Sequence, residues 1–481
     1  MEPERIDEYE WRVPIGTVEG MRVPGIVFGS EDLMRKAVDD RAVLQVANVA
    51  TLPGIVGASY AMPDIHWGYG FPIGGVAAFD ADAGGVISPG GVGFDIACGV
   101  RLLRTELSWK PEVRPRIHEL VAALGHATPR GTGAGGRLRL TRGEVLCVLR
   151  DGVGFALERG IGTPADAELC EDEGVLREAV PDEVSERALT RGAGQLGSLG
   201  AGNHFLEVQV VQEILEPGAA NVMGLFIGQV CVMIHCGSRG LGHQVCTDHL
   251  ALMDRVMRPL GIHVPDRQLA CVPLDHEAAQ RYLGAMNAAA NYARANRHVL
   301  TDGVRTCFET VFERSARDLG VNLVYDVAHN LAKLEEHEVD GRRLTLCVHR
   351  KGATRAFGPN HPSLPNAYRA IGQPVLIPGS MGTASFVLVG AAGAERKSFA
   401  STCHGAGRAL SRTQARKRIG GHELARQLEE QGIVLAPGSP KLLAEEAPFA
   451  YKDVEEVVRS CEGAGLTKTV AKLRPVGVVK G

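Results

Sequence analysis

The segment SPGGVGFDIACGVRLLRT carries an aspartate and a cysteine three residues apart, directly after a group of glycines. Glycine adopts backbone angles that strain other residues, so Asp95 and Cys98 can turn towards the same point. A carboxylate and a thiol that converge in this way can bind one cation. We therefore expect Asp95 and Cys98 to be metal ligands. The alternative is that Cys98 is a small buried apolar residue and Asp95 a turn residue.

Three histidines in other parts of the chain favour the metal hypothesis, because each ends a strand-like or glycine-rich segment. His204 follows the loop GQLGSLGAGN, His235 ends the apolar run LFIGQVCVMI, and His329 ends NLVYDVA. Imidazole, carboxylate and thiolate together can hold one or two divalent metals. By ligand softness alone, this donor set favours zinc over manganese.

A further histidine, His404, stands just before the first glycine of STCHGAGRALSR. We expect a helix to begin here, and the free amides and positive dipole of a helix N-terminus favour phosphate. A neutral imidazole at that point could attack a phosphate as a nucleophile.

A second group of polar residues would suit a purine nucleotide, because amide, carboxylate and hydroxyl groups stand beside glycine-rich turns. Its members are Asn203, Glu207, the turn Pro378 to Met381 and Ser385. Glu207 could accept a hydrogen bond from the exocyclic amine of guanine, or it could be a solvated strand residue.

Asp64 and His66 in AMPDIHWGYG are two residues apart, which places both side chains on one face of an extended segment. Either could support a metal ligand through a hydrogen bond. On sequence alone we prefer the interpretation that Asp64 caps a turn and that His66 is exposed in a loop.

The elements that must position these residues are mostly strands that end in glycine-rich loops. Short strands are expected within residues 12–28, and a hairpin around PGSM in QPVLIPGSMGTASFVLVG. Helical periodicity predicts a helix at 31–47, a buried helix pair within 276–315 and a helix at 453–462. We expect the C-terminal tail, including Lys480, to be solvated.

Composition excludes several classes of protein. Of 481 residues, 45% are hydrophobic, and no apolar stretch reaches the roughly 20 residues that cross a membrane. The eleven cysteines form no CxxC pair, which argues against a disulfide framework and a zinc ribbon. The N-terminus lacks an export signal, so we expect a cytoplasmic protein. A net charge of −4 means that nucleic acid would have to bind at local basic patches.

The order of these motifs predicts an α+β fold, in which mixed β-sheets with helices outside direct their strand ends at one metal-lined cleft. Because the motifs are spread from residue 95 to residue 480, we predict one catalytic domain over residues 1–481. Residues 110–182 contain no recognisable chemistry and would form a peripheral subdomain at most.

Eight motifs, taken together, closely resemble the RtcB family of RNA-splicing ligases. In chain order they are MPDIHWGYGFPIGG, GGVGFDIACGVR, GNHFLE, HCGSRGLGH, DVAHN, HRKGATRAF, PGSMG and STCHGAGRALSR. The resemblance implies a ligase that joins RNA ending in a 2′,3′-cyclic phosphate or 3′-phosphate to RNA with a 5′-hydroxyl, using GTP and manganese. Its role would be tRNA splicing, with tRNA halves as substrates, or RNA repair. Some members of the family need a small activating partner, archease.

The resemblance also implies a role for each site residue. Cys98 would bridge two manganese ions, with Asp95 and His204 completing one site and His235 and His329 the other. His404 would become guanylylated. The residues that match the guanine-nucleotide contacts are Asn203, His204, Phe205, Leu206, Glu207, His329, Asn330, Pro378, Gly379, Ser380, Met381, Ser385, His404, Gly405, Ala406, Gly407 and Lys480. Those in motifs that would contact RNA phosphates are Arg191, Arg239, Lys351 and Arg412.

The chain departs from the family pattern at two positions. Cys236 stands beside His235, where a second thiol could alter the metal preference, and Trp67 replaces a residue that is commonly polar. Two rival functions stay open. A metal-dependent phosphoesterase would only trim RNA ends, although His404 in its HGAG loop argues against this reading. A non-catalytic RNA-binding scaffold would bind RNA without metal or GTP.

Overall fold

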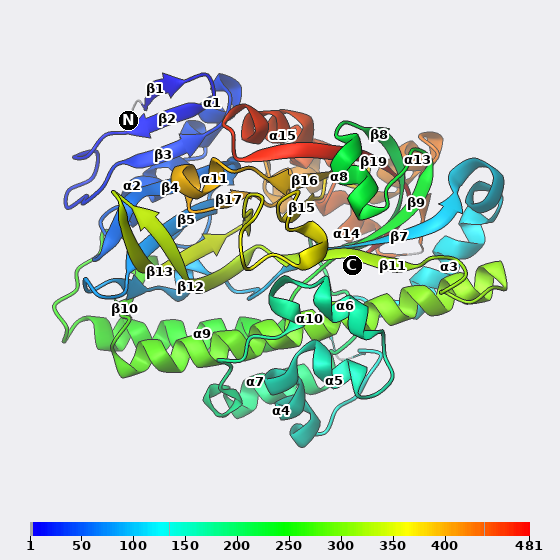
Figure 1. Cartoon of the computed structure of the whole chain (residues 1–481), viewed down its shortest axis with the longest axis horizontal. Coiled ribbons are helices and arrows are strands. Elements are labelled where there is room, and N and C mark those ends of the chain that lie inside the picture. The colour runs from blue at the N-terminus through cyan, green and yellow to red at the C-terminus, as the bar shows by residue number, and fades with distance from the viewer. Residues whose placement is uncertain (1–2, 134, 437) are drawn as a thin grey trace.

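The computed structural model describes residues 3–133, 135–436 and 438–481, and its elements confirm an α+β fold with mixed sheets. The predicted domain 1–481 includes four residues outside this range. Two main sheets lie on one side of a long helix, α10 (Glu277–Phe312), which runs across the molecule beside α9 (Arg239–Met257) (Figure 1). The smaller helices α4 (Arg142–Asp151), α5 (Val153–Leu157) and α7 (Glu186–Ala193) lie on the other side of α10.

The first main sheet combines N-terminal strands with a hairpin from the second half of the chain. Asp340 and Gly341 both have positive φ, as a tight two-residue hairpin turn requires, and this turn pairs Asn330 with Lys351. Among the described residues the strand order is β1 (Glu4–Asp7), β2 (Glu10–Val13), β3 (Gly25–Phe28), β4 (Ile55–His66), β5 (Ile73–Asp80), β13 (Arg342–Lys351) and β12 (Asn330–Val339).

The second main sheet brings the predicted metal ligands together at one end of its strands β11 (Asn322–Ala328), β7 (Gly99–Ser108), β9 (Gln229–Cys236) and β8 (Phe205–Ile214). Its register places Gly99 opposite Ala328 on one side and Cys236 on the other, and Phe205 opposite His235. The path through the described strands is β11, β7, β9, β8, β19 (Thr467–Lys480), β16 (Ser385–Gly390) and β15 (Pro374–Ile377), with β18 (Val434–Leu435) beside β19. Two short pairs complete the described sheets, β6 (Val86–Ile87) with β10 (Val272–Pro273) and β14 (Ala353–Arg355) with β17 (Ser401–Cys403).

Residues 276–315 contain one helix of 36 residues, α10, and not the predicted pair. Its internal glycines do not end the helix. A side chain at Gly284 would collide with Val180, and one at Gly303 with Arg137, so both glycines permit close packing. The buried alanines of α10 pack in the largest apolar cluster, together with residues of α9.

The predicted helix at 31–47 is interrupted. It forms α1 (Glu31–Asp39) and α2 (Ala42–Val49), separated at Arg41, whose φ of 62° is left-handed. The break lets Met34 of α1 and Val46 of α2 bury their side chains in one cluster. The apolar spacing alone did not reveal this change of direction.

Other expectations about the elements are confirmed. β15 and β16 form the hairpin around PGSM, and α15 (Val454–Gly463) matches the helix expected at 453–462.

The prediction of a solvated C-terminal tail is wrong, because the tail forms the end of β19 and pairs with β8. Lys480 therefore lies in a sheet, opposite Phe205.

Residues 110–182 pack on the main body at two places. α3 (Ile117–Ala127) lies against β19, while α4 (Arg142–Asp151) and α5 (Val153–Leu157) lie against α10. Within the described residues, no helix combines the length and apolar character needed to cross a bilayer. The remaining described helices are α6 (Pro164–Glu168), α8 (Pro217–Met223), α11 (Ala394–Ser398), α12 (Arg412–Arg418), α13 (Gly421–Glu430) and α14 (Pro440–Glu445).

Candidate active site

The five predicted metal ligands lie together at one end of strands β11, β7, β9 and β8. Cys98 Sγ is 3.4 Å from His204 Nε2 and 3.3 Å from His235 Nε2. His235 Nε2 is 3.3 Å from His329 Nε2, and His204 Nε2 is 2.9 Å from Asp95 Oδ2. The ligand atoms form two sets, Asp95 with Cys98 and His204, and Cys98 with His235 and His329, each with its atoms within 4.8 Å of one another. Cys98 is the member that both sets share.

The hydrogen bonds of His204 favour a positive charge at this centre. Its Nδ1 lies 2.9 Å from the carbonyl oxygen of Leu199, which can only accept, so Nδ1 carries a proton. Nε2 therefore faces the Asp95 carboxylate and the Cys98 sulfur. Burial favours the neutral ring, but the neighbouring thiols and Asp95 raise the pKa of His204 well above its ordinary value. The same electron-rich atoms would hold a divalent ion, so each ligand set fits one.

A strained turn and a buried arginine fix the backbone around this centre. Ala97 has φ of 52°, and a left-handed conformation costs a non-glycine residue about 1–2 kcal/mol. Arg297 of α10 donates hydrogen bonds to the carbonyl oxygens of Ala97, at 2.9 Å, and Cys236, at 2.8 Å. Its guanidinium also forms two hydrogen bonds with Asp326 of β11. One buried arginine thus links the three segments that precede or follow the clustered ligands.

His404 lies beside the second ligand set and is held by a buried carboxylate. Its ring centre is 4.8 Å from that of His329. Its Nδ1 is 2.6 Å from Oδ2 of Asp64, and its backbone N–H donates to the same oxygen at 3.0 Å. Burial opposes charge on Asp64, but the charge and hydrogen bonds of His404 hold the pKa of this carboxyl below its ordinary value. A proton on Nδ1 leaves the lone pair on Nε2, as a nucleophile oriented by a carboxylate requires.

Three sequence predictions near His404 are wrong. His404 follows strand β17 and does not begin a helix, because α12 starts only at Arg412. Asp64 lies in β4, fully buried, and is not a turn cap, and His66 is the half-buried last residue of the same strand and not an exposed loop residue. Gly407, with φ of 71°, passes so close to the backbone of Asp64 that a Cβ atom would lie 2.2 Å from its carbonyl oxygen. The sequence contained one indication that Asp64 belongs to the site, because Asp64 and His66 are two residues apart and so share one face of an extended segment.

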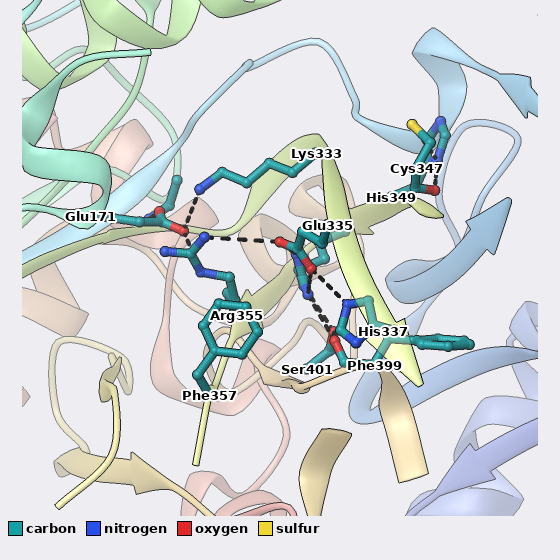
Figure 2. A network of polar contacts seen from close by, with 12 residues as sticks. Glu171, Lys333, Glu335, His337, Cys347, His349, Arg355, Phe357, Phe399 and Ser401 are labelled. Atoms are coloured by element: carbon teal, nitrogen blue, oxygen red, sulfur yellow. Dashed lines mark hydrogen bonds and ion pairs between the residues drawn. The ribbon is translucent and has the colours of Figure 1, made fainter. Parts of the chain in front are cut away.

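The turn that leads into β17 is also strained and is held by a buried ion-pair network (Figure 2). Phe399 and Ala400 have φ of 50° and 47°. Arg350 donates to the carbonyl oxygen of Phe399 and to Ser401 Oγ, both at 2.8 Å. The same guanidinium binds both carboxylate oxygens of Glu335, at 2.7 and 2.8 Å.

Figure 2 shows how this network continues on both sides of Glu335. Arg355 lies between Glu335 and Glu171, and Lys333 Nζ donates to Glu171 at 2.9 Å. His337 Nε2 donates to Glu335 at 3.1 Å, from the other side of that carboxylate. The buried charges are therefore paired, as their burial requires.

We expect Arg350→Met to lower the free energy of unfolding by about 3–5 kcal/mol, because it leaves Glu335 without its bidentate partner and the β17 turn without its donor. Chemical denaturation measures this loss. Arg343→Met is the matched control, since Arg343 lies on the same strand and its ion pair with Glu336 is exposed. Its effect should stay below about 0.5–1 kcal/mol. Equal effects of both substitutions would contradict the role given to Arg350.

A cavity of about 330 Å³ opens beside both ligand sets and His404. Among the described residues, four predicted nucleotide contacts are absent from its lining, namely His204, Leu206, Glu207 and Ser385. Leu206 is fully buried in an apolar cluster. The predicted nucleotide contacts that line the cavity are Asn203, Phe205, His329, Asn330, Pro378, Gly379, Ser380, Met381, His404, Gly405, Ala406, Gly407 and Lys480.

Glu207 and Ser385 form a buried polar cluster with Gln209 behind the PGSM turn. Gln209 Nε2 donates to Glu207 Oε2 at 2.8 Å and to Ser385 Oγ at 2.9 Å, and the Gly379 amide donates to Ser385 Oγ at 3.2 Å. Glu207 Oε1 is buried without a hydrogen-bond partner among the described residues. Burial raises the pKa of Glu207 to about 7. A buried acceptor without a partner is uncommon, and the N–H group of a ligand would satisfy it.

The four basic residues that were predicted to contact RNA occupy two places. Lys351 and Arg412 line the cavity, whereas Arg191 and Arg239 are absent from its lining in the described part of the chain. Burial lowers the pKa of Lys351 to about 7. Arg412 is paired with Glu446 at 3.0 Å. Contacts of these residues with RNA stay a prediction.

Cys236 does not join the ligand sets found among the described residues. Its thiol donates to the carbonyl oxygens of Ser198 and Leu199, at 3.3 and 3.0 Å, and so lies behind His204. Leu199 accepts from His204 Nδ1 as well, so Cys236 contacts the surroundings of the ligand and not the metal position.

The fold and the ligand clusters define the class, an α+β protein whose strand ends carry residues that could hold metal ions beside a carboxylate-held histidine. Comparison with known proteins then gives the family. A family model described as tRNA-splicing ligase RtcB matches residues 45–481, and the chain belongs to the RtcB family.

Relatives with this description match nearly the whole chain. The tRNA-splicing ligase RtcB of Thermococcus kodakarensis is 54% identical over 477 residues, which cover 99% of this chain and 98% of the relative. The corresponding protein of Archaeoglobus fulgidus is 52% identical over the same length, with the same coverage. The RNA-splicing ligase RtcB of Mycobacterium tuberculosis is 55% identical over 439 residues, which cover 91% of this chain and all of the relative.

Proposed function

We propose that this protein is an RNA ligase that joins a 2′,3′-cyclic phosphate or 3′-phosphate end to a 5′-hydroxyl end, such as the ends of tRNA halves, using GTP. The observation that carries the proposal is His404, held by Asp64 beside two ligand sets that share Cys98. Membership of the RtcB family supports it, since the relatives are named as tRNA-splicing or RNA-splicing ligases.

Two divalent ions would be held by Asp95, Cys98 and His204 and by Cys98, His235 and His329. Bound there, such ions neutralise the charge that develops on a phosphate under attack. The choice of manganese rests on the family resemblance, because ligand softness alone favours zinc.

The guanine of GTP would lie at the end of the cavity formed by the PGSM turn, Phe205 and Lys480. Glu207 Oε1, which lacks a partner among the described residues, supports this placement because guanine presents two N–H donors on one edge. Gly405 and Gly407 flank the loop after His404, where the α-phosphate must lie for attack.

The chemistry then follows from the position of His404. Its Nε2 attacks the α-phosphorus of GTP while the bond to pyrophosphate breaks, and Asp64 keeps the remaining ring proton on Nδ1. Water opens a cyclic phosphate to a 3′-phosphate. An oxygen of this 3′-phosphate attacks the guanylyl phosphorus, the N–P bond breaks, and His404 is free again. Finally the 5′-hydroxyl of the second RNA attacks the activated 3′-phosphate and GMP leaves.

Incubation with GTP labelled at the α-phosphate tests this proposal. We expect a protein-bound label that is labile in acid and stable in alkali, as a phosphoramidate is, and a joined product when both RNA ends are added. The phosphoesterase alternative predicts trimmed RNA ends without a protein label. The RNA-binding scaffold predicts RNA binding that is unchanged without metal or GTP, and no product.

We expect GTP to bind about tenfold more tightly at pH 8 than at pH 6. A charged acceptor forms the stronger hydrogen bond with guanine, and a carboxyl with a pKa of about 7 is mostly protonated at pH 6 and mostly ionised at pH 8. Calorimetric titration across this range measures the change. In Glu207→Gln the affinity for GTP should depend less on pH, because this side chain no longer titrates. An equal pH dependence of GTP affinity in both proteins would contradict the role given to Glu207.

A further inference from the structure

Tyr69 and Phe94 line the cavity, and the ring of His243 stacks on Phe94 beside it. We call these three residues the aromatic ledge. Tyr69 and Phe94 meet edge to face, with ring centres 5.3 Å apart and planes at 72°. Phe94 and His243 are stacked, with ring centres 4.9 Å apart and planes at 27°. The three residues come from three separate segments, so the aromatic ledge is a product of the tertiary fold.

The aromatic ledge is open to solvent, which is unusual for packed rings. Tyr69 is 36% exposed and His243 is exposed, while Phe94 between them is half-buried. Trp67, two residues before Tyr69, is 44% exposed. A contiguous group of partly open rings beside a cavity suits a planar ligand.

Hydrogen bonds to the backbone around Tyr69 hold this part of the aromatic ledge in place. The Nζ of Lys351 donates to the carbonyl oxygens of Tyr69 and Phe71, the latter at 3.1 Å. Gln268 Oε1 accepts from the amide of Gly70 at 2.8 Å. The backbone that carries Tyr69 is therefore fixed on both sides of the loop, which lowers the entropy lost when a ligand binds.

The aromatic ledge also adjoins the reacting centre and a positive charge. Phe94 directly precedes Asp95, and Tyr69 and Phe94 line the same cavity as His404. Exposed Arg191 lies close enough to lower the pKa of His243, after the larger effect of burial, and donates to the neighbouring Gln244 at 3.2 Å. A stacking surface with a cation beside it is how proteins bind a single nucleic-acid strand.

We propose that the aromatic ledge binds, by stacking, the terminal nucleobase of an RNA end that is joined at this site. The inference rests on the proposed function and adds a nucleobase subsite to it. The guanine of GTP has other contacts in the proposal, at Glu207, the PGSM turn and Lys480. The ring faces carry no hydrogen-bonding pattern, so the subsite would accept any base.

Fluorescence of 2-aminopurine tests the subsite without requiring ligation. One oligonucleotide carries the probe at a 3′-phosphorylated end and a second carries it at a 5′-hydroxyl end, each added without GTP. Stacking should quench the probe in at least one of them and so identify the end. The Tyr69→Leu/Phe94→Leu protein should lose this quenching and bind about tenfold more weakly, ~1.4 kcal/mol. Tyr69→Phe should retain both, and Phe226→Leu, on an exposed ring in another region, is the matched control.

A double-mutant cycle with abasic RNA gives a second readout. Removal of the terminal base should weaken binding to the natural protein about tenfold and leave binding to Tyr69→Leu/Phe94→Leu almost unchanged. Equal losses in both proteins, or no quenching at either end, would overturn the subsite. A matching loss of GTP affinity in the leucine variant, with its metal content unchanged, would place guanine on the ledge and overturn it as well. A natural protein that never takes up label but still quenches the probe would reject the proposed function and keep the subsite.

Discussion

Replacement of His404 by alanine is expected to abolish the transfer of label from GTP to the protein and to lower the rate of RNA joining at least ~10⁴-fold. The reason is that Nδ1 of His404 is held by Asp64 at 2.6 Å, which leaves the lone pair for attack on Nε2. Gel analysis of the labelled protein and single-turnover joining of two RNA strands measure the two effects.

Asp64→Asn gives a graded test of the same arrangement. An amide can face Nδ1 with its N–H group, which favours the wrong tautomer and places the proton on Nε2. We expect labelling to slow by a factor of about 10²–10⁴ without disappearing. His126→Ala, on the exposed face of α3, is the matched control and should label at the natural rate. Persistent labelling of His404→Ala would show that another residue is the nucleophile.

The residues of the two candidate ligand sets could be predicted from the sequence, because the same local pattern recurs in several segments. Cys98 directly precedes β7, His235 is the second-last residue of β9, and His329 directly follows β11. Each has a glycine or asparagine within two residues after it, and the strands are buried enough to be recognised from apolar runs. Neighbouring strands of one sheet bring such ends together. The register of β7 with β9 and β11 could not be predicted, yet any register that aligns the strand ends gives the same cluster.

The partner of His404 could not be predicted in the same way. Asp64 lies 340 residues earlier, in another sheet, and its own neighbours fit an ordinary turn. What decides the contact is the pairing of β14 with β17 beside β4, together with the left-handed turn at Phe399 and Ala400. These depend on buried charges such as Arg350 and Glu335, whose pairing is set by tertiary packing and has no periodic signal.

Helix ends were predicted wrongly in two places. One helix was expected at residues 31–47 and is broken at Arg41, whereas a helix pair was expected within residues 276–315 and a single helix, α10, was found. Apolar periodicity indicates which face of a helix is buried. It does not indicate whether the chain changes direction between two helical segments. At Arg41 a left-handed residue redirects the chain, while at Gly284 and Gly303 the missing side chains permit contact with Val180 and Arg137. The glycines of α10 therefore permit close packing without ending the helix, whereas a non-glycine residue, Arg41, stands at the break between α1 and α2.

Replacement of Cys98 by alanine is expected to remove more metal than replacement of any other ligand, because its sulfur is the atom that both sets share. We expect the natural protein to bind two divalent ions per chain. His329→Ala removes a donor from the second set only and should leave one tightly bound ion. Cys98→Ala leaves two donors in each set, and we expect the affinity for both ions to fall at least about 100-fold.

Equilibrium dialysis with manganese and with zinc, followed by metal analysis, measures this stoichiometry without any dependence on ligation. The absorption of bound cobalt gives a second readout, since the charge-transfer band of a cobalt–thiolate bond must vanish in Cys98→Ala and persist in His329→Ala. Cys307→Ala is the matched control, because Cys307 is buried in α10 away from the ligand sets. If Cys98→Ala retained two ions with the natural affinity, the shared thiolate would be excluded and the two sets would have to bind metal independently.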